Sequence, residues 1–219
     1  MSLFDSVRAI LFDFDGTLIE PSIDFDEMRQ RVLDIAARYG LDTGPLAGMH
    51  VLELVTKAAA ELSEHDGKSE AFVADTDQAV IDIEVEAASR VLPYDGVPAM
   101  LDALHAHGYR VGIVTRNCRP AVDRVLERFP LRHEILLSRD DVARVKPDPH
   151  HLRVALDHLG VPAHKSLMCG DHPMDVDVGK AIGARTVGVL RPGVEPTYFC
   201  DNAPDVILDH VTHLLQILA

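Results

Sequence analysis

The sequence predicts an α/β protein: a parallel sheet with helices on both faces, and an all-helical segment inserted after the first strand. Residues 7–12 form an almost continuous apolar run, which is typical of a strand buried on both faces. From residue 93 onward, short apolar strands alternate with helical patterns, as they do in parallel sheets. Between these regions, residues 19–92 show helical periodicity and no lasting strand alternation.

The inserted segment is predicted to form three helices. The first ends at Gly40, the second begins at Val51, and the third spans residues 72–91. The segment holds 16 acidic and 6 basic residues, so it carries 10 of the 14 net negative charges of the chain. We therefore predict two domains: a core made of residues 1–18 and 93–219, and a helical domain made of residues 19–92.

The rest of the core is predicted from the alternation of strands and helices. A helix that begins at Pro98 stops near Gly108, and later helices also end next to a glycine or proline. The predicted strands are residues 109–115, 134–137, 166–169, 185–189 and 206–207, and the other predicted helices are residues 121–129, 150–159, 174–182 and 210–218.

Composition excludes several classes of function. Hydrophobic residues make up 47% of the chain and charged residues 26%, as in a globular protein. The net charge of −14 argues against binding to nucleic acid or to anionic membranes. Three cysteines without metal or redox spacing predict reduced thiols, and no signal peptide or membrane-spanning run is visible. We expect a cytoplasmic protein, as a monomer or homodimer.

Polar residues gather at four places where a strand or loop gives way to a helix. The carboxyl ends of parallel strands meet at one edge of the sheet, where ligands bind in α/β folds. We therefore expect the four groups to share one site. They are Asp13-Phe14-Asp15-Gly16-Thr17, Thr115-Arg116-Asn117, Lys146-Pro147-Asp148-Pro149, and Gly170-Asp171 with Asp175 four residues later.

Each group has a structural alternative. Asp15-Gly16 could form a turn, and an EF-hand is excluded because Asp24 stands at the twelfth position without suitable ligands between. Thr115 and Asp171 could cap helices, and Lys146 could be an ordinary surface lysine. Together, however, the groups supply what phosphoryl transfer needs: a nucleophilic carboxylate, an acid–base carboxylate, ligands for a hard cation such as Mg²⁺, a hydroxyl and a cation.

This set of motifs, in this order, resembles the haloacid dehalogenase superfamily of phosphohydrolases. The helical insert occupies the position of the C1 cap in phosphoglycolate-phosphatase-like members. The resemblance implies a Rossmann-like parallel-sheet core with an inserted all-helical cap domain that closes over the site and selects the substrate. The Asp-Phe-Asp-Gly-Thr run resembles the first motif, Thr115 the second, Lys146-Pro-Asp-Pro the third, and Gly170-Asp171 with Asp175 the fourth.

The resemblance also implies roles for individual residues. Asp13 is expected to be the nucleophile, and Asp15 the acid that protonates the leaving group and then activates water. Arg116 stands where many relatives have Asn, so either Asn117 takes that role one residue later or Arg116 reaches the substrate. The expected phosphate-binding residues are Thr115, Asn117 and Lys146, and the expected Mg²⁺ ligands are Asp13, the main-chain carbonyl of Asp15, Asp171 and Asp175.

The resulting hypothesis is a Mg²⁺-dependent phosphatase that acts on a small phosphorylated metabolite, with phosphoglycolate as the leading named substrate. The acid at Asp15 favours phosphoryl chemistry over dehalogenation, because a leaving halide needs no proton. Two alternatives stay open: a phosphoglucomutase-like isomerase of the same fold, and a non-catalytic binding or regulatory module.

Overall fold

The computed structural model describes residues 3–65 and 68–218 and divides into two compact units. One unit consists of the chain up to Pro21 and from Val91 onward, and the other is Ser22–Arg90. The predicted domain boundaries lay at residues 18/19 and 92/93, two or three residues from these positions. Each unit has its own apolar core, so each is described by itself.

The first unit contains a parallel sheet, as the sequence predicts. Within the described residues the sheet has six strands in the order β3-β2-β1-β4-β5-β6. All four residues of β1 are buried, which accounts for its continuous apolar sequence. The strands are β1 Ala9–Phe12, β2 Arg110–Val114, β3 Ile135–Leu137, β4 Ser166–Gly170, β5 Arg185–Val189 and β6 Val206–Leu208.

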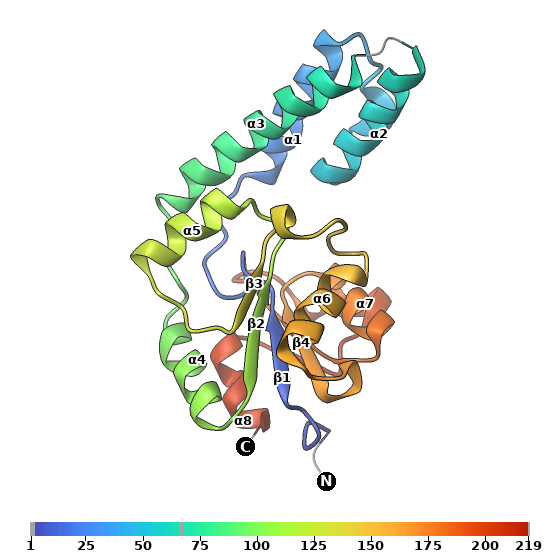
Figure 1. Ribbon diagram of the computed structural model, residues 1–219. Helices are drawn as coiled ribbons and strands as arrows, with labels where there is room; N and C mark the ends of the chain where they lie inside the picture. The colour runs from blue at the N-terminus through green and yellow to red at the C-terminus, as the bar shows by residue number, and fades with distance from the viewer. Residues whose placement is uncertain (1–2, 66–67, 219) are drawn as a thin grey trace. The chain divides into compact units, whose positions relative to one another are not determined.

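Helices cover both faces of this sheet (Figure 1). On one face, α6 and α7 pack against β1, β2 and β4 through a core that includes Leu11, Leu156 and Met168. On the other face lie α4 and α8, and α4 buries Met100, Leu101 and Leu104. The helices of this unit are α4 Val97–Ala106, α5 Arg119–Arg128, α6 His150–Leu159, α7 Pro173–Ile182 and α8 Leu214–Leu218.

The C-terminal helix is shorter than predicted. Instead of one helix over residues 210–218, a 3₁₀ turn at Val211–His213 precedes α8. The His210 side chain accepts a hydrogen bond from the Thr212 main-chain N–H, which favours a capped, tighter turn. The apolar spacing continues through this turn, so the sequence pattern could not distinguish it from an α-helix.

The second unit is helical, and its described residues contain no strand. It consists of α1 Phe25–Arg38, α2 Val51–His65 and α3 Ser69–Ala88. Asp24 caps α1 by accepting hydrogen bonds from the N–H groups of Asp26 and Glu27. Its core is built around Leu54 and Phe72, both fully buried, with the Tyr39 ring edge-on to Phe72 at 5.5 Å.

No helix in the described part of the chain is both long and apolar enough to cross a membrane.

Phe72 and its neighbour Val73 offer a matched test of the helical core. Phe72→Ala should lower the free energy of unfolding of this unit by about 3–5 kcal/mol, because it leaves a cavity where a buried ring packed. Val73 is 39% exposed, so Val73→Ala should change it by less than about 1 kcal/mol. Urea denaturation followed by circular dichroism measures both, and equal effects would contradict this packing.

Candidate active site

The site lies where β1 and β4, neighbours at the centre of the sheet, reach their carboxyl ends. Asp13 follows β1, and its N–H donates a hydrogen bond to the carbonyl of Cys169 in β4. Asp171 directly follows β4, and Asp175 lies in the first turn of α7. Within this unit, α4 is the next helix along the chain after β1 and α7 is the next after β4. These two helices cover opposite faces of the sheet, which leaves this edge open for a ligand.

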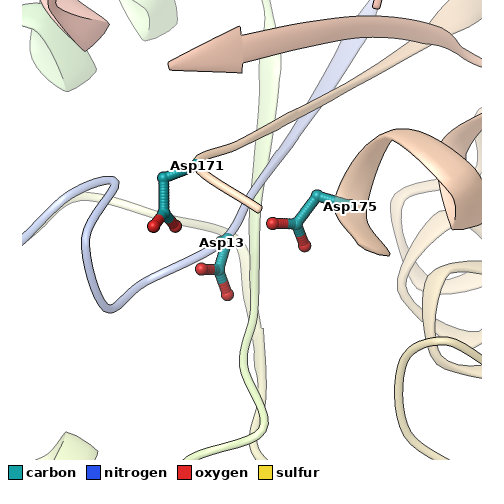
Figure 2. Close-up of side chains that lie close together, drawn as sticks. All are labelled: Asp13, Asp171 and Asp175. Atoms are coloured by element: carbon teal, nitrogen blue, oxygen red, sulfur yellow. The ribbon is translucent and has the colours of Figure 1, made fainter. Parts of the chain in front are cut away.

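Three carboxylates meet at this edge (Figure 2). Asp13, Asp171 and Asp175 each place a carboxylate oxygen within 4.8 Å of the others. Asp171 and Asp175 are buried. Burial and the neighbouring carboxylates raise the pKa of Asp171 well above its ordinary value. Burial also raises the pKa of Asp175 to about 6, although Lys146 opposes this effect.

Two glycines make room for this cluster. Gly16 has a positive φ of 83°, and a Cβ there would lie 2.6 Å from an Asp171 carboxylate oxygen. A Cβ on Gly170 would collide with the carboxyl group of Asp175. The absence of a Cβ at both glycines therefore leaves room for two of the three carboxylates. The crowding of buried oxygen ligands with like charge fits a hard divalent cation such as Mg²⁺.

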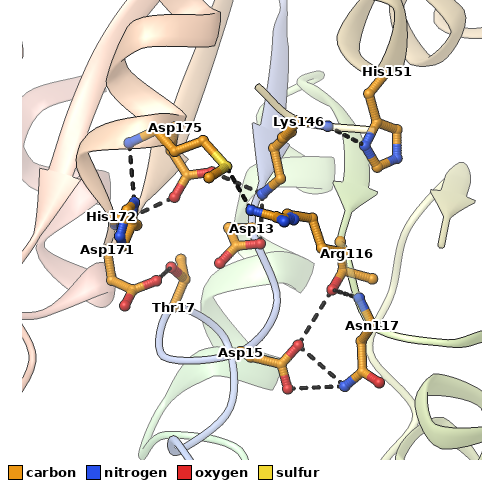
Figure 3. Close-up of polar contacts among 12 residues, drawn as sticks. Asp13, Asp15, Thr17, Arg116, Asn117, Lys146, His151, Asp171, His172 and Asp175 are labelled. Carbon is orange, nitrogen blue, oxygen red and sulfur yellow. Dashed lines mark hydrogen bonds and ion pairs between the residues drawn. The ribbon is translucent and has the colours of Figure 1, made fainter. Parts of the chain in front are cut away.

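Lys146 supplies a buried positive charge to the cluster (Figure 3). Its Nζ lies 2.6 Å from Asp13 Oδ1 and 2.7 Å from Asp175 Oδ1. Burial lowers the pKa of Lys146, but the two carboxylates outweigh burial and raise the pKa above its usual value. Lys146 is therefore a permanent ammonium, and the surface-lysine alternative is wrong because the side chain is 2% exposed.

Asp175 is fixed by the start of α7 as well as by Lys146. Its Oδ2 accepts a hydrogen bond from the His172 N–H, and His172 Nδ1 accepts one from Met174 N–H, which forms a reciprocal cap. Asp175 is thus an acid in the first turn of α7, where the helix dipole favours a negative charge. The same carboxylate also faces the cluster, so the Asp175 side chain both caps α7 and contributes to the three-carboxylate group.

Asp15 lies apart from the three-carboxylate cluster. Its carboxylate accepts hydrogen bonds from Asn117 Nδ2, at 3.1 and 3.2 Å, and from Thr115 Oγ1 at 3.2 Å. The Asn117 N–H also donates to Thr115 Oγ1 at 3.0 Å. The structure therefore brings both predicted phosphate-binding residues that follow β2 to Asp15. The Asp15 carboxylate is not part of the three-carboxylate cluster, so its main-chain carbonyl stays the predicted metal ligand.

Arg116 points from the end of β2 towards α7. Its Nη1 lies 3.2 Å from Met174 Sδ, so the guanidinium spans the gap between the second and fourth polar groups. Both sequence alternatives for this position stay predictions. Asn117 binds Asp15, while the neighbouring arginine extends in a different direction.

His151 holds the Lys146 main chain and was not singled out from the sequence. It is fully buried, and its Nδ1 lies 3.4 Å from the Lys146 main-chain nitrogen and its Nε2 3.2 Å from the Leu137 carbonyl. An amide can only donate and a carbonyl only accept, so the proton resides on Nε2. Burial, aided by the Lys146 charge, lowers the pKa of His151 to about 4 and keeps it neutral.

Two further residues contact Asp171: Thr17 belongs to the first polar group but had no predicted role, and Arg191 was missed. Thr17 Oγ1 donates a hydrogen bond to Asp171 Oδ1 at 3.1 Å, and Arg191 Nε lies 3.1 Å from Asp171 Oδ2. Arg191 follows the end of β5 by two residues. The rule that found the other groups, a polar residue just after a strand, would have found it. For His151 no such signal exists, because its spacing is that of an ordinary helix residue.

Comparison with known proteins identifies the family. A model of the haloacid dehalogenase-like hydrolases matches residues 10–189, so the chain belongs to this family. The N-acetylmuramic acid 6-phosphate phosphatase of Pseudomonas aeruginosa is 30% identical over 97% of this chain and 95% of that protein. The phosphoglycolate phosphatase of Rhodospirillum rubrum is 31% identical over 82% of this chain and 78% of that protein.

Solved structures share the same fold. A haloacid dehalogenase-like hydrolase from Bacteroides fragilis superposes with a TM-score of 0.69 at 21% identity, over 95% of this chain and 99% of that one. The family resemblance drawn from the four motifs is therefore confirmed, as is the α/β fold with its parallel sheet.

The adjacent residues His150 and His151 offer a matched test of the hydrogen bonds that hold the Lys146 main chain. His151→Leu should lower the free energy of unfolding by about 1–3 kcal/mol, because it leaves the buried Lys146 N–H and Leu137 carbonyl without this partner. His150 is half-buried, so His150→Leu should have a smaller effect. Urea titration measures both variants. A loss at His150 as large as that at His151 would contradict the assigned hydrogen bonds.

The raised pKa of Asp175 predicts a pH dependence of stability in the presence of a chelator. The pKa of Asp175 is about 6 in the folded protein and 3.8 ordinarily, so the folded state binds more protons than the unfolded state between these pH values. The free energy of unfolding contributed by Asp175 is therefore largest below about pH 4 and falls as the pH rises through 6.

Asp175→Asn should flatten this slope, whereas Asp177→Asn, an exposed position on the same helix, should preserve it. Chemical denaturation at pH 4, 5, 6 and 7 measures the slopes. Equal slopes in the wild type and Asp175→Asn would refute the assignment.

Proposed function

We propose that this protein is a Mg²⁺-dependent phosphatase that hydrolyses a small phosphate monoester through an aspartyl-phosphate on Asp13. The observation that carries the proposal is the separation of two kinds of carboxylate at one sheet edge. Asp13 lies in the cluster with Lys146, while Asp15 is held a short distance away by Thr115 and Asn117. A nucleophile and an acid–base group need such different surroundings.

In the proposed reaction, an oxygen of Asp13 attacks phosphorus while the bond from phosphorus to the leaving oxygen breaks. Lys146 keeps the Asp13 carboxylate ionised and oriented, because its ammonium lies 2.6 Å away. Asp15 gives its proton to the leaving oxygen. It then accepts a proton from water, which attacks phosphorus and releases phosphate and free Asp13.

Asp13, Asp171, Asp175 and the main-chain carbonyl of Asp15 are the residues that would hold Mg²⁺. When bound, the ion would neutralise the phosphoryl oxygens and the carboxylates as charge develops. The fit rests on the proximity of the three carboxylates and on the burial of Asp171 and Asp175, which pack where Gly16 and Gly170 lack a Cβ. Thr115, Asn117 and Lys146 would bind the phosphoryl oxygens.

The relatives support phosphatase chemistry and leave the substrate open. One named relative acts on N-acetylmuramic acid 6-phosphate and another on phosphoglycolate, at nearly equal identity. We propose a small phosphorylated metabolite, with phosphoglycolate among the candidates. The helical unit as a substrate-selecting cap, a cytoplasmic location and a monomeric or homodimeric state stay predictions.

The proposal is tested by phosphate release from a panel that contains phosphoglycolate, N-acetylmuramic acid 6-phosphate and other small phosphomonoesters. Release in Mg²⁺ that stops with chelator is expected. Release that survives chelation would overturn the metal assignment. Interconversion of sugar phosphates that needs a bisphosphate, without net release of phosphate, would favour the isomerase alternative instead.

The nucleophile is tested by Asp13→Asn. Turnover should fall by at least about 10³-fold, because an amide oxygen cannot form the covalent intermediate. The variant should also stop trapping phosphate on the protein in acid-quenched reactions, as seen by intact mass. Circular dichroism shows whether the variant is folded. A folded variant that retained most of its activity would remove Asp13 as the nucleophile.

A further inference from the structure

Arg191 is paired with a carboxylate of the proposed metal site, although it belongs to none of the four polar groups. It lies in the loop after β5, and β5 pairs with β4 so that Gly170 is level with Gly188. This pairing brings the loop next to Asp171. Arg191 Nε lies 3.1 Å from Asp171 Oδ2, and the Asp171 side chain is only 6% exposed.

The charges around the cluster are divided between two cations. Lys146 binds Asp13 and Asp175, whereas the ion pair of Asp171 is with Arg191. Thr17 occupies the other oxygen of Asp171 through a hydrogen bond. The positive charge of Arg191 therefore offsets the negative charge of Asp171, the one carboxylate of the cluster that Lys146 does not bind.

The contact between Arg191 and Asp171 is electrostatic rather than directional. Nε is buried but lacks the alignment of a hydrogen bond to any acceptor in the described residues. A competing cation could thus replace it without breaking an aligned hydrogen bond. The guanidinium also has a cation–π contact that does not involve Asp171, since its Cζ lies 5.7 Å from the centre of the Tyr198 ring.

Space for movement lies beside the same side chain. Arg191 lines a cavity of about 220 Å³ together with Thr17, Tyr94 and His210. The Tyr94 hydroxyl at this cavity is buried and has no hydrogen-bond partner among residues 3–65 and 68–218. A displaced guanidinium would therefore find both room and an unpaired acceptor on this side.

We propose that Arg191 is the counter-ion of the metal-free site and competes with the divalent cation for Asp171, so that it sets the metal affinity. The proposal rests on the proposed metal site. Two cations beside one carboxylate repel each other, and a unit charge about 5 Å from a dication weakens binding about tenfold even at the dielectric constant of water. Arg191 thus weakens metal binding and stabilises the metal-free protein.

The test is calorimetric titration of MgCl₂ into the full-length protein after treatment with chelator. Arg191→Met should lower the dissociation constant about tenfold. Arg191→Lys, which keeps the charge, should stay near the wild-type value. The control is Arg185→Met at the other end of β5, whose Nη1 lies 3.7 Å from Asp205 Oδ1; it should leave the dissociation constant unchanged.

Thermal melts give a second readout that does not depend on turnover. Without metal, Arg191→Met should melt below the wild type, because the buried carboxylates lose a counter-charge. Mg²⁺ should then raise its melting temperature by more than it raises that of the wild type, as tighter binding to the folded state requires. Arg191→Gln serves the same purpose should the Met variant fail to fold.

The outcomes separate this inference from the proposed function. An unchanged dissociation constant in Arg191→Met would overturn the competition and leave the phosphatase proposal intact. A higher dissociation constant would also overturn it, and would mean that Arg191 orients Asp171 for the metal. Absence of Mg²⁺ binding in the wild type would overturn both this inference and the metal assignment, whatever the phosphate-release assay shows.

Discussion

Three carboxylates are held close together in a buried site, and the surrounding structure compensates for their mutual repulsion. Unpaired charges at this depth are costly, so each must meet a cation or take up a proton. Lys146 bridges Asp13 and Asp175, and Arg191 pairs with Asp171. The remaining imbalance appears as the raised pKa values of Asp171 and Asp175. This imbalance favours the divalent cation that we propose for the site.

The order of strands explains how these groups meet. Asp13 and Asp171 are more than 150 residues apart in the chain, but β1 and β4 are hydrogen-bonded neighbours at the centre of the sheet. Phe12, the last residue of β1, lies level with Cys169, the residue before the end of β4. The next side chains therefore converge at one edge. Parallel pairing is essential here, because an antiparallel neighbour would place the second carboxylate at the opposite edge.

Uncharged side chains complete the site by holding the charged residues in position through hydrogen bonds. His151 stays neutral and accepts a hydrogen bond from the Lys146 main-chain N–H. This bond fixes the main chain from which the Lys146 side chain extends to the cluster. Asn117 and Thr115 hold Asp15 outside the cluster by hydrogen bonds to its carboxylate. One sheet edge thus contains two different carboxylate environments.

The sequence by itself determined the parallel α/β core, the helical insert and the residues of the four polar groups. Strand burial and helical spacing are local patterns, and a strand that ends on a carboxylate can be recognised within a few residues. Only the tertiary structure decided which carboxylates share a site and which cations meet them. Lys146 and Arg191 pair with carboxylates from other segments of the chain, and His151 bonds both the Lys146 main chain and the Leu137 carbonyl of β3. Such contacts depend on the folded packing, which no short stretch of sequence encodes.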